Sequence, residues 1–239
     1  MPSSKLIVAW VAAAIGIAVA LSLGNWQTRR GDEKVAMQAK ADAAERAAPL
    51  QIEATFASIE GVALSLPRRV RVSGVFDPTG TVLLDNRMLG PVVGYQVITP
   101  LLIGDGLPAV LIDRGWKARG ADPAHPDMVP APSGRVTVQG LAVARPSALL
   151  ELGSTKLDVP GVWQNLDYDA YERLTKRTIA RFVIRQADPG AADGLRHEWP
   201  SAASGVDRHR GYALQWYALA GLICSLAGYF AWKTWRQQR

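Results

Sequence analysis

The chain has 239 residues, of which 49% are hydrophobic and 20% are charged. This length suits one domain of ordinary size with additional segments, and the composition excludes a disordered chain and a polytopic transporter. The net charge is +6, but all 21 acidic and 23 of the 27 basic residues lie between Arg29 and Arg210, which leaves that stretch at +2. The sequence has no basic stripe with interleaved aromatics, so no nucleic-acid partner is expected.

Two uncharged runs predict membrane-spanning helices, one near each end of the chain. They cover residues 6–28 and 211–232. At about 1.5 Å per residue each would be roughly 33 Å long, enough to cross a bilayer core of about 30 Å. We therefore predict transmembrane helices over 6–28 and 211–232, cytoplasmic tails at 1–5 and 233–239, and an extracytoplasmic domain over 29–210.

The flanking charges predict the orientation of these runs. Lys233, Arg236 and Arg239 follow the second run without an acidic residue, so its C-terminal end is expected in the cytoplasm. If both runs span, the N-terminus is also cytoplasmic and the middle domain is periplasmic. Residues 18–20 (Ala-Val-Ala) fit a signal-peptide cleavage site, which is the alternative to an anchor. The absence of an Arg- and Ser-rich presequence favours a bacterial cytoplasmic (inner) membrane.

The middle of the chain is predicted to be rich in β-strands. Residues 32–48 are rich in Ala, Glu and Lys and are expected to form a helix that ends at Pro49. Asp167 is expected to cap a short helix over 168–177, and Asp105-Gly106 predicts a hairpin turn. The predicted class is α+β, with N- and C-terminal transmembrane helices flanking a β-rich domain. Strands are expected at residues 69–73, 81–84, 95–99, 109–112, 135–143 and 180–186.

Common catalytic patterns are missing from the sequence, and the protein is not expected to be an enzyme. There is no GxSxG, Walker A or HExxH motif, and the three histidines lack ligand-spaced partners for a zinc ion. Residues 104–109 match GxGxxA, but Pro108 and the predicted strand after it leave no helix to receive a pyrophosphate. The single cysteine, Cys224, excludes a disulfide framework and a thiolate pair for copper.

Polar and aromatic residues gather where both runs would reach the outer membrane surface. Trp26 and Gln27 close the first run, whereas His209, Tyr212 and Trp216 follow one another at spacings of three and four near the start of the second. Aromatic residues at this level are commonly plain membrane anchors. A neutral imidazole is also a haem-iron ligand, so both an anchoring role and a haem role are open for this region.

These residues resemble the signatures of the surfeit locus protein 1 family, assembly factors for cytochrome c oxidase. Residues 23–30 (Leu-Gly-Asn-Trp-Gln-Thr-Arg-Arg) resemble the Leu-Gly-x-Trp-Gln-x-x-Arg motif at the end of the family's first span. Because four ordered motifs cover nearly the whole chain, the resemblance is specific. The other three comprise Asn86-Arg87 with Gly94-Tyr95 and Thr99-Pro100-Leu101, then Arg114-Gly115-Trp116, then His209 with Tyr212, Ala213 and Trp216.

The resemblance implies an uncleaved anchor and a role in maturing the haem a centre of the oxidase. It implies haem a as the cofactor, with His209 as the axial ligand of the haem iron. We expect Trp26, Gln27, Tyr212 and Trp216 to line the site. The implied partners are the oxidase catalytic subunit, the haem a synthesis machinery and membrane lipid.

The central motifs leave a second function open. Arg87, Arg114 and Trp116 are candidates for docking an oxidase subunit, and the two arginines are alternatively candidates for an inward ion-pair network. The same motifs also suit turns, with Gly115 supplying an unusual backbone angle and Trp116 a core anchor. The alternative function is a scaffold that stabilises a nascent oxidase subunit through its periplasmic domain without binding haem.

Overall fold

The computed structural model describes residues 4–120, 126–149, 157–187, 193–199, 201 and 203–237. The chain divides into two compact units. Met1–Ala39 and Ser201–Arg239 form the helical unit, and Lys40–Pro200 forms the sheet unit. Each unit is described by itself.

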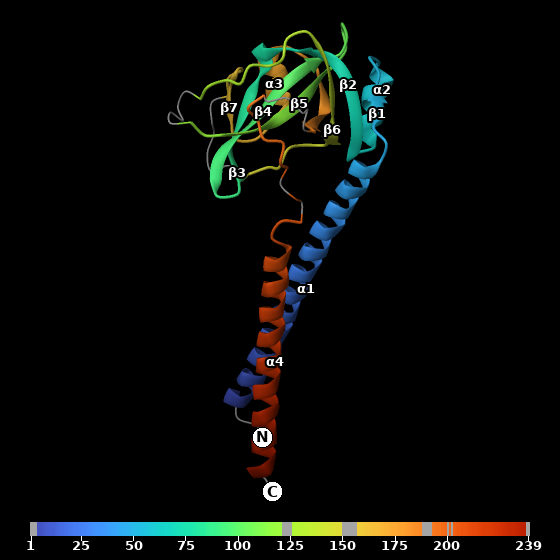
Figure 1. The fold of residues 1–239 in the computed structure, drawn as a ribbon. Helices are drawn as coiled ribbons and strands as arrows, with labels where there is room; N and C mark the ends of the chain where they lie inside the picture. Colours follow the sequence, from blue (N-terminus) through green and yellow to red (C-terminus); the bar gives the residue numbers. More distant parts are fainter. Residues whose placement is uncertain are drawn as a thin grey trace. The chain divides into compact units, whose positions relative to one another are not determined.

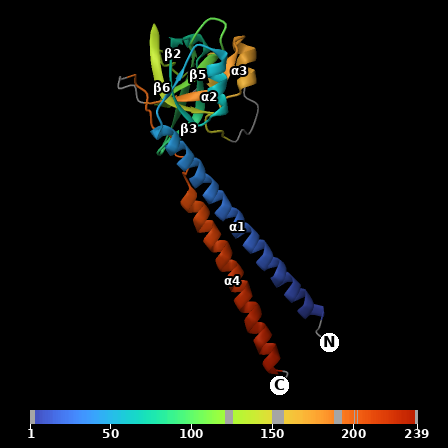
Figure 2. The same ribbon diagram turned by 90° about the vertical axis from the view of Figure 1, so that its right-hand side faces the viewer.

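The helical unit pairs two long helices, α1 (Ser4–Arg46) and α4 (Val206–Gln237), which run antiparallel and side by side (Figures 1 and 2). Both are long and apolar enough to cross a membrane, with windows of mean hydropathy 2.6 and 1.3. Small side chains such as Ala20, Ala213 and Ala220 are buried in this unit. Small residues let the backbones of membrane helices approach closely. The predicted spans 6–28 and 211–232 therefore lie inside α1 and α4.

α1 contains both helical segments that were expected in the N-terminal region. It continues without a break from the predicted span through residues 32–46 and ends at Arg46, ahead of Pro49. The continuation carries no proline and is rich in Ala, Glu and Lys, which are strong helix formers. The end of the apolar run at residue 28 is therefore a change in surface character and not a helix boundary.

The described residues of the sheet unit form an eight-stranded sheet in the order β1-β2-β6-β8-β5-β4-β3-β7. Figure 1 labels β1 to β7 of this sheet. An additional pairing of β2 with β4, at Val75↔Leu102 and Phe76↔Leu101, closes β2, β6, β8, β5 and β4 into a barrel. The strands are β1 Leu50–Ile52, β2 Arg68–Phe76, β3 Val82–Leu89, β4 Val92–Leu102, β5 Ala109–Ala118, β6 Arg135–Val143, β7 Gly161–Trp163 and β8 Ile179–Gln186.

The two sides of the barrel wall carry different apolar clusters. On β5, Val110 and Ile112 belong to one cluster, whereas Ala109 and Leu111 belong to the other, as the alternation of a strand requires. The first cluster draws residues from all five barrel strands and from α2 (Phe56–Leu64), so it fills the interior. The second cluster packs under α3 (Tyr168–Thr175) on the outside.

All six predicted strands are present, and α3 begins after Asp167 as predicted. The Asp167 carboxylate accepts hydrogen bonds from the backbone N–H groups of Asp169 and Ala170, and the helix ends at Thr175, before the C-cap Lys176, which has a left-handed φ of 53°. Asp105-Gly106 lies in the connection between the antiparallel strands β4 and β5, as predicted, and Gly106 has a φ of +71°. The GxGxxA match at residues 104–109 is therefore part of this turn.

Four short elements of the described residues were missed from the sequence: β1, β7, α2 and the 3-10 helix η1 (Pro78–Gly80). β1 and β7 have three residues each and form only by parallel pairing with β2 and β3. α2 begins after Thr55, whose side chain accepts a hydrogen bond from the backbone N–H of Ser58. The N-cap of α2 is a local signal that the sequence does contain.

Candidate functional site

The central contact of the helical unit joins His209 of α4 to Gln27 of α1. Nδ1 of His209 lies 2.7 Å from Oε1 of Gln27. Because a carboxamide oxygen only accepts hydrogen bonds, Nδ1 must carry the proton in this contact. The lone pair of the neutral ring is then on Nε2. Among the residues that the structure describes, none hydrogen bonds to Nε2 of His209.

A second set of contacts fixes the register of the two helices near this pair. The Tyr217 hydroxyl donates a hydrogen bond of 2.8 Å to Oδ1 of Asn25 and lies 3.3 Å from Oγ1 of Thr28. The Tyr217 ring lies directly over Gly24, where an added Cβ would be only 2.7 Å from Cε1. Only glycine therefore fits at position 24 without a shift of the ring.

The contact between α1 and the start of α4 continues beyond His209. Gly31 lies under His209, with its would-be Cβ 3.7 Å from the His209 Cβ. Lys34 donates a 2.9 Å hydrogen bond to the Ser204 carbonyl, and Oε1 of Gln38 accepts one of 2.7 Å from the Ser201 hydroxyl. These bonds hold the segment that leads into α4 against the polar part of α1. His209 is therefore positioned by its own contact with Gln27 and by the contacts of the segment before it.

The predicted lining residues do not all face this contact. Gln27 touches His209, and Trp216 is half-buried two helical turns further along the same stripe of α4. Trp26 and Tyr212 are 50% and 46% exposed, and no recorded polar or ring contact joins either to His209 within the described residues. Whether these four residues bind haem stays a prediction.

Asn25, Thr28, Tyr217 and Gly24 were not singled out as site residues from the sequence. The signal that was available is the small residue at every fourth position, Gly16, Ala20 and Gly24, a spacing typical of close helix pairs in membranes. It predicts the contact face of α1, though not the partner on α4.

In the sheet unit, the motif arginine Arg87 is buried and bonded to the main chain. It is 6% exposed, and its guanidinium donates to the carbonyls of Ser147 and Gln164, the latter at 2.7 Å. Trp116 is also buried, and its indole N–H donates a 2.8 Å hydrogen bond to the carbonyl of Arg87.

Arg114 of β5 is also buried and bonded to the main chain. It is 1% exposed and donates hydrogen bonds of 3.1 and 2.8 Å to the carbonyls of Val129 and Pro130. Its guanidinium carbon lies 5.5 Å from the centre of the Phe76 ring, within the range of a cation–π contact. Both arginines therefore tie loops to strands of the sheet.

These contacts correct the expectations for the central motifs. Asn86 and Gly115 have φ values of 58° and +140°, but they lie inside β3 and β5 and not in turns. The unusual angle of Gly115 and the burial of Trp116 are confirmed. The guanidinium groups bond carbonyls, and no ion pair of either is recorded among the residues that the structure describes. Docking of a partner stays a prediction, but these buried side chains can act only by shaping a surface.

The sheet unit also buries a carboxyl group that sequence analysis overlooked. Asp113 of β5 is fully buried, and the backbone N–H of Gly115 acts on its carboxyl group. Burial raises the pKa of the Asp113 carboxyl to about 8, while the nearby charges of Arg185 and Arg87 oppose the rise. The available signal was an Asp directly after the apolar strand residues 109–112.

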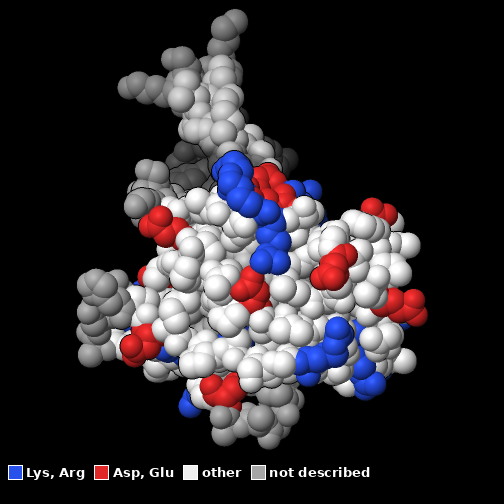
Figure 3. Space-filling view, turned by 90° about the horizontal axis from the view of Figure 1, so that it is seen from above, with Lys and Arg blue, Asp and Glu red and all other residues white. Residues whose placement is uncertain are grey.

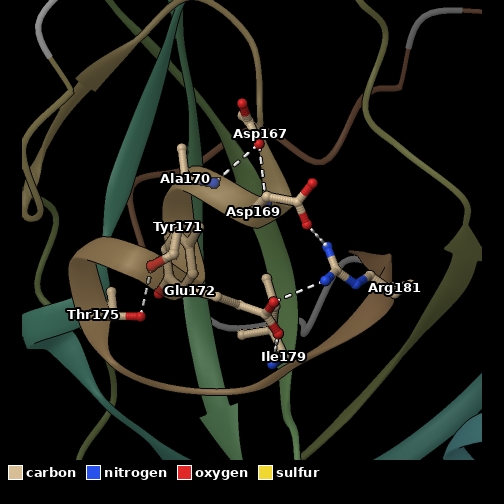
Figure 4. Close-up of polar contacts among 8 residues, drawn as sticks. All are labelled: Asp167, Asp169, Ala170, Tyr171, Glu172, Thr175, Ile179 and Arg181. Atoms are coloured by element: carbon tan, nitrogen blue, oxygen red, sulfur yellow. Dashed lines mark hydrogen bonds and ion pairs between the residues drawn. The ribbon is translucent and has the colours of Figure 1, made fainter.

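The outer surface of the sheet unit carries paired charges. Arg181 of β8 donates to Asp169 at 2.7 Å and to Glu172 at 2.8 Å, and so holds α3 to the sheet (Figure 4). Oε1 of Glu172 also accepts a hydrogen bond from the backbone N–H of Ile179. On the face shown in Figure 3, basic and acidic side chains lie among large uncharged areas.

The donor set of the helical unit suits a haem better than a bare metal ion. No group of three His, Cys, Asp or Glu side chains that could hold an ion is found in the described parts of the chain. A haem iron needs only one or two protein ligands, since the porphyrin nitrogens supply the others. A single His209 with Nε2 open meets that requirement.

Comparison with known proteins agrees with the motifs. The family model described as the SURF1 family matches residues 14–221. A SURF1-like protein of Dictyostelium discoideum is 31% identical over 106 residues, which are 42% of this chain and 39% of that protein. The aligned region thus spans less than half the length of this relative. The family is known in general for cytochrome oxidase assembly factors and not for enzymes. The match over residues 14–221 shows that the chain belongs to the SURF1 family.

Proposed function

We propose that this protein is a membrane-anchored assembly factor for haem-copper (cytochrome c) oxidase that assists delivery of haem a to the catalytic subunit or its insertion there. In this proposal His209 is the axial ligand of the haem iron. The observation that carries it is the 2.7 Å contact between Gln27 Oε1 and His209 Nδ1, which leaves Nε2 open. Family membership supports the assembly role.

The Gln27 contact prepares the imidazole for a metal before any haem arrives. Metal-binding histidines almost always donate their other ring N–H to an oxygen acceptor, which fixes the tautomer and the ring orientation. Gln27 provides this acceptor from the neighbouring helix. The neutral amide of Gln27 is a weaker acceptor for the Nδ1 proton than a carboxylate would be. The imidazole is therefore a less basic ligand than it would be beside a carboxylate. Moderate basicity suits a carrier, because a carrier must release the haem again.

The position of His209 along the helix pair suits an amphipathic cargo. Gln27 lies at the end of the predicted span 6–28, and His209 lies just before the span 211–232. A haem with a long hydrocarbon tail would keep that tail in lipid and its iron at the membrane surface. The exposed aromatic rings of Trp26 and Tyr212 are available for contact with a porphyrin.

Arg208 and Arg210 are exposed beside His209 and are candidates for pairing with the haem propionates. We place the protein in a bacterial inner membrane with both termini in the cytoplasm and the sheet unit in the periplasm. The two apolar helices are consistent with such anchoring.

The test is the visible spectrum of protein purified from cells that make haem a. We expect a Soret band in the wild type and its loss in His209→Ala, while Gln215→Ala, an exposed position on the same helix, keeps the band. A band of equal strength in His209→Ala would exclude this ligand. No band in any variant, with oxidase assembly still dependent on the protein, would favour the scaffold function instead.

A further inference from the structure

We propose that the sheet unit contains a binding site for a small carboxylate anion, in a cavity beside β8, with Arg185 as its charged contact and Trp199 as its flat wall. This site is separate from the haem proposal, because every residue that carries it belongs to the sheet unit.

The cavity has the size of a small ligand site. Its volume is about 340 Å³, near the lower end of the roughly 300–1,000 Å³ typical of small-molecule pockets. Its lining combines charged, polar and aromatic side chains with the apolar Leu141. The main lining residues are Glu45, Arg69, Leu141, Arg185, His197 and Trp199.

Arg185 is a half-buried charged group whose Nε is buried without a hydrogen-bond partner among the described residues. Burial lowers the pKa of its guanidinium, and no hydrogen bond to any of its nitrogens is recorded within the described ranges. Its one recorded ring contact is with Trp199, at 6.0 Å from the guanidinium carbon to the ring centre. Asp113 and Glu45 act on the charge of Arg185, but the buried Nε–H has no acceptor among the described residues, and a ligand or ordered water that accepts from it would remove this cost.

Arg181, four residues earlier on β8, is an arginine of the same strand whose guanidinium has hydrogen-bond partners. Its guanidinium is paired with two carboxylates of α3, Asp169 and Glu172 (Figure 4). Arg185 lines the cavity instead. The two arginines therefore provide a matched pair for experiment.

A second polar group on the cavity wall is also unsatisfied. The His197 side chain is 8% exposed, and its Nε2 has no hydrogen-bond partner within the described residues. The nearest acid, Oδ2 of Asp193, is 3.6 Å from this nitrogen, beyond hydrogen-bond range. His197 lines the same cavity as Arg185 and is therefore the second candidate to contact a ligand there.

The charges around the cavity favour a single negative charge on the ligand. Arg69 and Arg185 contribute two positive charges, and Glu45 contributes one exposed negative charge. One guanidinium N–H of Arg69 already donates to the Glu45 carbonyl at 3.2 Å. The buried Asp113 is the cross-strand partner of Arg185. Because burial raises the pKa of Asp113, it neutralises Arg185 only in part near pH 7.

The shape of the donors favours a carboxylate with an apolar or flat body. A guanidinium matches a carboxylate through two parallel N–H···O bonds. The Trp199 indole N–H donates to the Gln186 carbonyl at 3.3 Å, so the polar edge of the ring is occupied. Its apolar surface is left to contact the body of the ligand.

Binding is measured on the full-length, haem-free protein in detergent micelles by isothermal titration calorimetry. The probe is benzoate, and its neutral analogue benzamide is the control ligand. We expect saturable binding of benzoate and at least ~10-fold weaker binding of benzamide, equivalent to about 1.4 kcal/mol. Equal affinity for both, or no saturable benzoate binding, would overturn the proposal and leave a cavity that holds water.

Variants assign the binding to this cavity. Arg185→Gln should weaken benzoate binding by at least ~10-fold, whereas Arg181→Gln should change it by less than ~2-fold. Arg185→Lys keeps the positive charge but lacks the planar donor fork, so it should give an intermediate affinity. If Arg185→Gln does not fold, Arg185→Lys still tests the assignment. Unchanged affinity in Arg185→Gln or Arg185→Lys would contradict the assignment.

Two peptides separate the possible sources of the carboxylate. Gly-Gly-Phe with a free C-terminus is compared with the same peptide carrying a C-terminal amide. Binding of the free acid alone would identify the C-terminus of a polypeptide as the ligand, whereas binding of benzoate but neither peptide would identify a free organic acid. Since no haem is present, failure of this site leaves the proposal for His209 untouched.

Discussion

Gln27 and Arg87 are both polar residues of the family signatures, but the two units use them differently. In the helical unit, Gln27 bonds a half-buried side chain and leaves Nε2 of His209 open. In the sheet unit, Arg87 and Arg114 are buried, and each donates to two main-chain carbonyls. The difference teaches that a motif residue can orient another side chain in one unit and hold loops in the other.

The units also differ in what holds them together. The sheet unit has an apolar interior built from five strands, whereas the helices of the helical unit meet through small residues and a few hydrogen bonds. Membrane helices gain no hydrophobic driving force from pairing in lipid, so packing and polar contacts decide their register. Substitutions in the two units should therefore produce effects of different size and kind.

The largest expected effect concerns the buried Asp113. The pKa of its carboxyl is raised to about 8 in the folded protein, against about 3.9 in an unfolded chain. Between these values folding takes up a proton, so this group makes the free energy of unfolding fall as pH rises from about 4 to about 8. A shift of this size corresponds to on the order of 5 kcal/mol.

Asp113→Asn should remove this part of the pH dependence. The measurement is the urea midpoint of the purified protein between about pH 5 and pH 8.5, followed by circular dichroism of the strands. Glu60→Gln, at an exposed position on α2, should keep the wild-type slope. A slope that is the same in Asp113→Asn and the wild type would contradict the role of this carboxyl.

Next in size is the loss of a core side chain from the barrel. Phe182 is fully buried in the interior cluster, and Phe182→Ala should lower the free energy of unfolding of the sheet unit by about 3–5 kcal/mol. Phe56 is 55% exposed, so Phe56→Ala should cost less than about 1 kcal/mol. Chemical unfolding of both variants checks this, and equal losses would show that the interior is not packed as described.

A substitution at Gly24 should break the helical unit while leaving the barrel intact. An added Cβ would lie 2.7 Å from the Tyr217 ring, and Gly24→Leu should cost about 1–3 kcal/mol by overpacking. Gly221→Leu, on α4, meets nothing within 4 Å at the Cβ position and is the matched control.

Helix pairing is read out by oxidative cross-linking of cysteines placed at Gly16 and Ile223 in a Cys224→Ser background. A Cβ at Gly16 would lie 3.4 Å from Cδ1 of Ile223. The cross-link should form in the wild-type background and with Gly221→Leu, and it should fall with Gly24→Leu. Full cross-linking with Gly24→Leu would disprove the close approach at this position.

The smallest expected effect is the loss of one hydroxyl group. Tyr217→Phe removes the hydrogen bond to Asn25 and the contact with Thr28, and should weaken helix pairing by about 0.5–1.5 kcal/mol. Tyr229→Phe, at a 53% exposed position on α4, should leave the cross-linking yield unchanged. The two variants would give the same yield if the hydroxyl played no part in the register.

Local patterns predicted much of this fold, and tertiary contacts decided the rest. Strict alternation identified β2, and the capping residue Asp167 identified the start of α3. β1 and β7 are too short to carry a pattern, because pairing with distant strands makes them strands. The burial of Arg87 depends on carbonyls 60 and 77 residues away, which no local pattern encodes.

The candidate site was predictable only in part for the same reason. His209 and Gln27 stood out as polar residues at the ends of two apolar runs, and the structure joins them. The partner of Tyr217 on α1 depends on the register between two helices that are far apart in sequence. Helix periodicity aligns residues on one helix, but it does not say which residues of the other helix they meet.

The most direct test of the central claim is the iron–imidazole stretching frequency of the haem-bound protein, measured by resonance Raman spectroscopy. If Gln27 accepts the Nδ1 proton of an iron-bound His209, the acceptor at position 27 sets the basicity of the ligand. The account predicts a higher frequency for Gln27→Glu and a lower one for Gln27→Leu than for the wild type. The same frequency in all three proteins would contradict it.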